Sequence, residues 1–87
     1  MKIDINTTII DVRSQEEYSG QHVPGAINIP LDQLALRIAE IKALPQPIVV
    51  YCRSGVRSGM AVSILKQNGI DNVTNGGGLG DMLIAIK

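Results

Sequence analysis

The chain has 87 residues, a formal net charge of zero and a single cysteine. This length leaves room for one domain, so we assign residues 1–87 to a single domain. Hydrophobic residues make up 45% and charged residues 18% of the chain, which is typical of a globular domain and argues against disorder. The balanced charge argues against a nucleic-acid-binding surface, and no apolar run reaches the roughly 18 residues that a membrane span needs.

The cellular compartment follows from the cysteine and from the first residues. One cysteine cannot form an internal disulfide, and a free reactive thiol is most stable in a reducing compartment. The start of the chain, Met1-Lys2-Ile3-Asp4, lacks the apolar segment of a signal peptide. We therefore expect a cytoplasmic protein, and a periplasmic location fits if a leader has been removed.

The first elements along the chain are a predicted strand and a short helix. Residues 8–12 are rich in β-branched side chains and predict a strand. Ser14 and Glu17 have the spacing of a capping box, which predicts a helix that ends at about Ser19. Gly20 is then expected to close this helix in the left-handed conformation.

A turn, a strand and a helix come next. Pro and Gly residues predict a turn over residues 22–25, and residues 26–29 predict a short strand. Asp32 is expected to cap the following helix, whose end is set by Pro45. The apolar positions of that helix recur at helical spacing at Leu34, Ile38 and Ile41.

The second half of the chain continues the alternation of strands and helices. The expected elements are a buried strand over 48–51, a helix from about 58 that ends at Gly69, a short strand over 73–74, a flexible loop over 75–78 and a helix over 79–86. This order predicts an α/β fold with a parallel sheet covered by helices. Functional sites in such sheets form beyond the carboxyl ends of the strands, where Cys52, residues 11–13 and residues 76–78 all lie.

Cys52 lies between the carboxyl end of a predicted strand and the start of a predicted helix. Unpaired backbone N–H groups and the positive end of a helix dipole favour negative charge at such a position. Arg53 and Arg57 add positive charge, so we predict that Cys52 is a thiolate and a catalytic nucleophile. The alternative is a buried structural cysteine, the commoner case among proteins in general. The catalytic interpretation requires a thiol that ionises near neutral pH and is open to the outside.

The length of the loop after Cys52 bears on the substrate. Four residues separate Cys52 from Arg57, and they can curl so that their N–H groups point inward as an anion nest. Gly55 permits a backbone conformation that a larger residue resists. Protein tyrosine phosphatases resemble this arrangement but separate their cysteine and arginine by a longer run. The shorter loop fits a tetrahedral phosphate poorly and one extra sulfur atom well, which favours sulfur chemistry over a phosphatase or an arsenate reductase.

Five ordered motifs between Ile9 and about Met82 resemble one known family. They are Ile10-Asp11-Val12-Arg13, Glu17-Tyr18, Gly20-Gln21-His22-Val23-Pro24-Gly25-Ala26-Ile27-Asn28-Ile29-Pro30, Tyr51-Cys52-Arg53-Ser54-Gly55-Val56-Arg57-Ser58 and Asn75-Gly76-Gly77-Gly78. Together they resemble the single-domain rhodaneses, which are thiosulfate sulfurtransferases. Relatives often carry a Trp after the final glycines, where this chain has Leu79-Gly80-Asp81-Met82, and Met82 can fill the same apolar space.

The resemblance implies a three-layer rhodanese-like fold, with a central parallel sheet of about five strands flanked by helices. It also implies a persulfide on Cys52 and transfer of sulfane sulfur from thiosulfate to cyanide or to a thiol, with no metal and no organic cofactor. Two alternatives stay open: a carrier that passes its persulfide to a protein thiol, and a non-catalytic binding module of the same fold. A protein sulfur acceptor is therefore a candidate partner beside the small molecules.

The residues predicted to bind substrate are those of the loop, namely Arg53, Ser54, Gly55, Val56, Arg57 and Ser58. Arg53 can reach the mouth of a pocket and contact the sulfonate end of thiosulfate. Arg57 either binds substrate or braces the loop through an internal ion pair. Ser54 and Ser58 either donate to the sulfur or cap the next helix, and we favour capping for Ser58.

Three further features have a structural interpretation that we favour over a catalytic one. Asp11 and Arg13 form a supporting pair, which either orients the Cys52 loop or, as we favour, stabilises the fold. His22 is expected to make a hydrogen bond within its turn, because an ionised cysteine needs no general base. Residues 76–78 lack the Lys-Ser/Thr of a P-loop, so we expect their glycines to allow close approach to the Cys52 loop.

Overall fold

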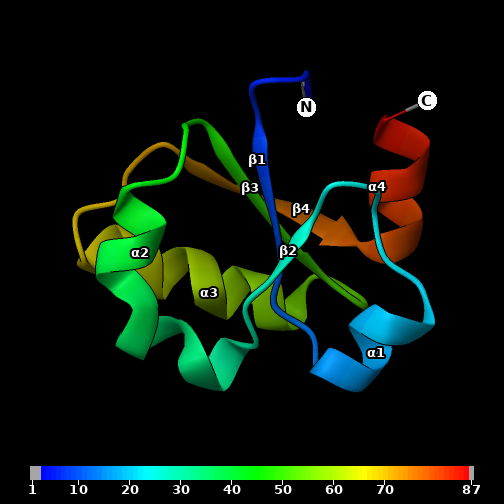
Figure 1. Ribbon diagram of the computed structural model, residues 1–87, viewed down its shortest axis with the longest axis horizontal. Coiled ribbons are helices and arrows are strands. Elements are labelled where there is room, and N and C mark those ends of the chain that lie inside the picture. The colour runs from blue at the N-terminus through cyan, green and yellow to red at the C-terminus, as the bar shows by residue number, and fades with distance from the viewer. Residues whose placement is uncertain (1–2, 87) are drawn as a thin grey trace.

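The computed structural model describes residues 3–86, which form a sheet with helices on both of its faces (Figure 1). In chain order the elements are β1 (Thr8–Asp11), α1 (Gln15–Gly20), β2 (Ile27–Asn28), the 3₁₀ helix η1 (Leu31–Arg37), α2 (Ile38–Lys42), β3 (Ile48–Cys52), α3 (Val56–Gln67), β4 (Val73–Gly78) and α4 (Leu79–Ala85). The strands are all parallel and lie in the order β2-β1-β3-β4. The predicted α/β fold with a parallel sheet is confirmed, but the described residues form four strands and not about five.

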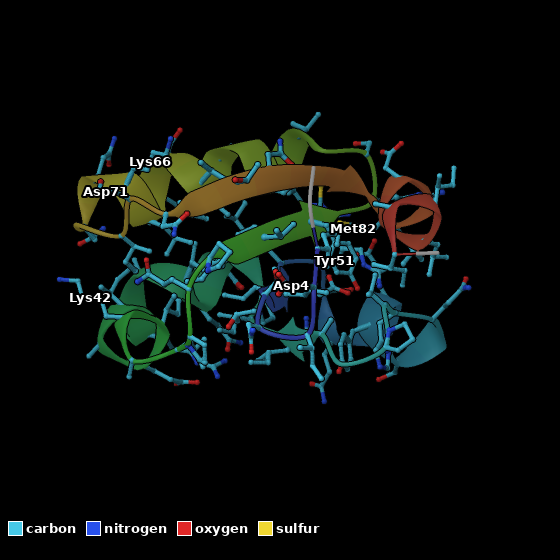
Figure 2. The ribbon with its side chains drawn as sticks, turned by 90° about the horizontal axis from the view of Figure 1, so that it is seen from above. Asp4, Lys42, Tyr51, Lys66, Asp71 and Met82 are labelled. Atoms are coloured by element: carbon cyan, nitrogen blue, oxygen red, sulfur yellow. The ribbon has the colours of Figure 1, made fainter. Side chains whose placement is uncertain are left out.

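The three layers follow from the alternation of side chains along the strands. On β3, Val50 and Cys52 face the side covered by α3, η1 and α2, while Val49 and Tyr51 face the opposite side. The second side is covered by α1 and α4 and includes Met82, which lies close to Tyr51 (Figure 2). Met82 has no exposed surface, so it fills apolar space at this position as the sequence predicted.

The start of α1 is formed as the sequence predicts, but its end is not. Ser14 and Glu17 make a complete capping box, in which the Glu17 N–H donates to Ser14 Oγ and the Ser14 N–H donates to Glu17 Oε1. Gly20 is the last residue of the helix and does not adopt a positive φ. The chain instead leaves the helix through Gln21, which is extended with a φ of −166°, so no left-handed cap is needed.

The segment after β2 also differs from its prediction. A 3₁₀ helix begins at Leu31 after Pro30, which makes no side-chain cap, so the predicted capping role of Asp32 is wrong. The predicted helix is split into η1 and α2, although its apolar positions still face the sheet, with Leu34 and Ile41 fully buried. η1 packs against α3 on the same side of the sheet.

The largest local difference concerns residues 75–78, which the sequence predicts as a flexible loop. They continue β4 and pair with β3, with a register shift that sets Val50 opposite Asn75 and Tyr51 opposite Gly77. Gly76 is thus an extra residue, as in a β-bulge. Composition alone disfavours glycine-rich strands, but here contacts with β3 determine the conformation.

None of the helices within residues 3–86 has both the length and the apolar character that crossing a bilayer would require.

Candidate active site around Cys52

Cys52 is the last residue of β3, and the chain turns sharply after it to begin α3 at Val56. The turn depends on Gly55, whose φ of +100° lies in the left-handed region that favours glycine. A Cβ built on Gly55 would also lie 3.4 Å from the Cα of Gly77. The strand, turn and helix therefore place the sulfur at the amino end of α3, as the sequence predicts.

The loop directs hydrogen-bond donors at the sulfur of Cys52. The Gly55 N–H lies 3.0 Å and the Ser58 N–H 3.4 Å from Sγ, and the Ser58 hydroxyl lies 3.3 Å away. Burial raises the pKa of the Cys52 thiol, but the hydrogen bonds from Ser58, Ser54 and Gly55 outweigh it and lower the pKa from 9.0 to about 7. A large fraction of Cys52 is therefore a thiolate at neutral pH.

The sulfur is less open than the catalytic interpretation requires. Cys52 has no exposed surface, although Arg53 and Ser54 beside it are exposed. The expectation of an open thiol is therefore wrong for this conformation, in which Cys52 belongs to the buried cluster on the α3 side of the sheet. A reagent can reach Sγ only if neighbouring residues move aside.

Arg57 forms an ion pair that joins the loop to α1. Its two terminal nitrogens donate to the two carboxylate oxygens of Glu17, at 2.7 Å and 3.0 Å. This pairing lowers the pKa of Glu17 to about 2, against the opposing effect of burial. It raises the pKa of Arg57, to which the charge on Cys52 adds a smaller effect. Arg57 thus lies in the field of the thiolate while both ends of its guanidinium group are held by Glu17.

Arg53 has a different setting. Its side chain is exposed and has no ion-pair partner among residues 3–86. Ser54 and Val56 are exposed beside it, and the side chain of Val56 is 70% exposed. The outer surface of the loop therefore carries one free positive charge next to an apolar side chain.

Ser58 does not cap α3, so the capping role that we favoured is wrong. It is the third residue of the helix, after Val56 and Arg57, and the N-cap is Gly55. Its hydroxyl is buried, donates to Asn75 Oδ1 at 2.7 Å and lies within hydrogen-bond distance of Cys52 Sγ. Ser58 therefore contacts the sulfur directly and links it to β4.

Asp11 and Arg13 form a buried ion pair on the opposite face of the sheet. Arg13 Nη2 donates to Asp11 Oδ2 at 2.7 Å, and the Tyr51 hydroxyl donates to the same oxygen at 2.7 Å. Arg13 also donates to the Gln21 carbonyl at 2.6 Å. Among the residues that the structure describes, neither side chain bonds to residues 52–58, which agrees with the fold-stabilising interpretation.

The glycines of β4 allow close packing against the loop, as the sequence predicts. A Cβ on Gly78 would clash with the Arg53 carbonyl oxygen, and one on Gly76 would lie 2.5 Å from Met82 Sδ. His22 makes its hydrogen bond to α1 and not within the turn over residues 22–25, with Nδ1 2.8 Å from the Tyr18 carbonyl oxygen.

Two adjoining cavities lie on the side of α1 and η1. The larger, of about 550 Å³, is lined in part by Val12, Leu31 and Arg57, and the smaller measures about 410 Å³. Both share Gln15 and Pro30. Arg57 is the only residue of the loop that lines the larger cavity, and Cys52 lines neither.

Two residues that contact the Cys52 loop, Glu17 and Asn75, are not among the predicted site residues. The sequence places Glu17 in a capping box and in a family motif, and in the structure it also pairs with Arg57. Asn75 was treated as part of a flexible loop, yet it bonds to both Gly55 and Ser58. The excess of basic over acidic residues near Cys52 could have indicated a distant carboxylate. Asn75 belongs to a family motif, but that motif does not indicate a bond to Gly55 or Ser58.

Comparison with known proteins agrees with this geometry. The model of the rhodanese-like domain matches residues 1–78. The thiosulfate sulfurtransferase PspE of Escherichia coli is 47% identical over 76 residues, which cover 84% of this chain and 71% of PspE. The thiosulfate:glutathione sulfurtransferase of Saccharomyces cerevisiae is 34% identical, over 84% of this chain and 61% of that protein. Other curated relatives are longer, and the chain spans 52% of YqhL of Bacillus subtilis.

Solved structures show the same fold. A rhodanese with anions from E. coli has a TM-score of 0.79 and 45% identity, over 86% of this chain and 89% of that one. The human single-domain sulfurtransferase TSTD1 has a TM-score of 0.77 and 26% identity, over 91% and 82%. With the strand, turn and helix around Cys52 and the matched model over most of the chain, these findings show that the chain belongs to the rhodanese family.

Proposed function

We propose that this chain is a thiosulfate sulfurtransferase that works through a persulfide on Cys52. The observation that carries the proposal is the set of donors directed at the sulfur of Cys52, namely the N–H groups of Gly55 and Ser58 and the Ser58 hydroxyl, which lower the pKa of the thiol to about 7. The names of the two sulfurtransferase relatives support thiosulfate as the donor. No metal or organic cofactor takes part in the proposed reaction.

In the first step the Cys52 thiolate attacks the outer sulfur of thiosulfate. A bond forms between the two sulfur atoms, the original sulfur–sulfur bond breaks, and sulfite leaves with its electron pair. The N–H groups of Gly55 and Ser58 stabilise negative charge on the sulfur, as oxyanion-hole donors do for oxygen. Because Cys52 is covered, residues around it must move before the donor reaches the sulfur.

In the second step cyanide or a thiol attacks the outer sulfur of the persulfide. The bond to Cys52 breaks, its electrons return to Cys52, and the thiolate is restored. We assign Arg53 to the sulfonate group of the donor, because its side chain is exposed and makes no ion pair within residues 3–86. Arg57 braces the loop through Glu17, and Ser54, Gly55, Val56 and Ser58 form the cradle.

Electrospray mass spectrometry after incubation with thiosulfate tests this function. We expect the mass of the intact protein to increase by the mass of one sulfur atom, and to return to its starting value after a thiol is added. Cys52→Ser is the control and should gain no mass. An unchanged mass of the wild-type protein would instead support a non-catalytic binding module.

Replacement of Arg53 by alanine should weaken donor binding. We expect KM for thiosulfate to rise by roughly three- to tenfold, because an exposed charge contributes about one kcal/mol to binding an anion. The melting temperature should stay unchanged, since the side chain makes no ion pair within residues 3–86. Lys66→Ala is the matched control, because Lys66 is basic and exposed but lies in the last turn of α3 (Figure 2). A lower melting temperature with unchanged KM would contradict the role given to Arg53.

A second candidate function is that of a persulfide carrier for a protein thiol. It is favoured by a relative from Bacillus subtilis described as a putative sulfur carrier protein, YrkF, which is 39% identical over 83% of this chain and 38% of its own length. The two functions share the first step and differ in the acceptor. Rates of sulfur release to cyanide, to a small thiol and to a thiol-bearing protein distinguish them.

A further inference from the structure

Asn75 on β4 contacts the Cys52 loop at two residues. Its Nδ2 donates to the Gly55 carbonyl oxygen at 3.0 Å, and its Oδ1 accepts the Ser58 hydroxyl at 2.7 Å. Gly55 and Ser58 are also residues whose backbone N–H groups donate to the sulfur of Cys52. One amide group therefore holds two of the donors on which the negative charge of the sulfur depends.

We propose that Asn75 is a positioning residue of the sulfur-transfer site, which holds Gly55 and Ser58 so that their donors stay directed at the sulfur of Cys52. The inference rests on the proposed function for its purpose, but its geometry does not depend on which donor or acceptor is used. Asn75 touches no reacting atom and acts only through the loop.

The backbone of β4 orients this amide. The register shift between β3 and β4 leaves Gly76 as an extra residue, and Gly77 has a φ of +88°. In this conformation the Gly77 N–H donates to Asn75 Oδ1 at 2.9 Å. The amide is therefore held from its own strand while it holds the loop.

The hydrogen bonds among Cys52, Ser58 and Asn75 can form both when the sulfur is a thiol and when it is a thiolate. A hydroxyl has one proton, so Ser58 can donate either to Asn75 or to the sulfur. When Cys52 is a thiol, its S–H donates to Ser58 Oγ, and Ser58 donates to Asn75. When Cys52 is ionised, the Ser58 proton turns to the sulfur, and Asn75 Oδ1 still accepts from Gly77. Neither charge state leaves the amide oxygen without a donor.

The charged groups around the site are not altered by a change at Asn75. Arg57 and its partner Glu17 lie on the loop and on α1, and Arg53 is exposed. On α4, Asp81 accepts from the Gly78 N–H at 2.8 Å. A changed titration of Cys52 in an uncharged Asn75 variant such as Asn75→Ala therefore reports the loop donors.

The test is a pH titration of Cys52, in which the ultraviolet absorbance of the thiolate is measured at each pH. Cys52 is the only cysteine, so the signal belongs to one group. We expect the midpoint of the wild-type protein at about 7 and that of Asn75→Ala about one unit higher, because loosened donors stabilise the anion less. Asn75→Asp should raise the midpoint at least as far, since it cannot donate to Gly55 and adds negative charge.

Asn68→Asp provides the matched control, because it makes the same change at the other end of α3. A helix of this length spans about 18 Å, and the side chain of Asn68 bonds only to the Ile64 carbonyl among the described residues. The midpoint of the Cys52 titration in Asn68→Asp should equal that in the wild-type protein.

An unchanged or lower midpoint in the Asn75 variants, measured below their melting temperatures, would overturn the inference. If Asn75→Ala does not fold, Asn75→Ser keeps the test, because it also adds no charge and its shorter side chain cannot bond to both Gly55 and Ser58. The titration needs no sulfur donor, so it gives an answer even if thiosulfate leaves the mass of the wild-type protein unchanged.

Discussion

Cys52→Ser should abolish sulfur transfer from thiosulfate while the domain stays folded. A serine hydroxyl is almost fully protonated at neutral pH and cannot carry the persulfide, so we expect activity to fall to the detection limit. The fold should persist, because serine is similar in size and its oxygen can still accept from the N–H groups of Gly55 and Ser58. The rate of sulfite release, measured beside the far-ultraviolet circular dichroism spectrum, gives both results. Sulfite release at the wild-type rate would refute the assigned nucleophile.

The same substitution should change how stability depends on pH. Folding lowers the pKa of Cys52 from 9.0 to about 7, so between these values the unfolded chain holds a proton that the folded protein has lost. The stabilisation is fully present above about pH 9 and disappears as the pH falls through about 7. The wild-type protein should therefore gain stability from pH 7 to pH 9 relative to Cys52→Ser, which can be measured by urea unfolding.

Asp11→Ala should destabilise the domain severely. The side chain of Asp11 has no exposed surface and that of Arg13 only 6%, so the substitution leaves a buried guanidinium group without its carboxylate. The Tyr51 hydroxyl also loses its acceptor. Removal of one partner of a buried pair costs about 3–5 kcal/mol, a large part of the roughly 5–15 kcal/mol that stabilises a typical domain. We expect the melting temperature to fall by about 12 °C or more.

Two further variants test whether the uncompensated buried charge causes this loss of stability. Arg13→Met combined with Asp11→Ala should recover part of the stability, because it removes the uncompensated charge. Glu40→Ala breaks an exposed pair with Arg37 and should leave the melting temperature nearly unchanged. Equal effects of Asp11→Ala and Glu40→Ala would show that burial of the Asp11–Arg13 pair does not matter.

Much of the fold could be predicted because its signals are local. The β-branched residues before Cys52 and the capping box at Ser14 depend on neighbours in sequence, and both elements form where expected. The strand at residues 75–78 could not be predicted in this way. Asparagine and glycine disfavour strands, and only pairing with β3 and contact with the loop hold these residues extended.

The same distinction between local and long-range signals applies to the site. The sequence indicated Cys52, the curled loop and the positive φ of Gly55, since these depend on spacing within a few residues. It did not indicate that Ser58 bonds to Asn75 or that Arg57 pairs with Glu17, because the partners lie 17 and 40 residues apart. The burial of the Cys52 sulfur also depends on packing between elements, which the spacing of residues in the sequence does not reveal.

The carboxylate of Glu17 links the motion of α1 to that of the Cys52 loop. It accepts from the Ser14 N–H at the start of α1 and from Arg57 on the loop, so one side chain serves two elements. Fraying of the first helical turn would release the guanidinium group, and withdrawal of Arg57 would weaken the helix start. The six-residue helix and the sulfur-bearing loop should thus open together, and their backbone amides should exchange hydrogen for deuterium at linked rates.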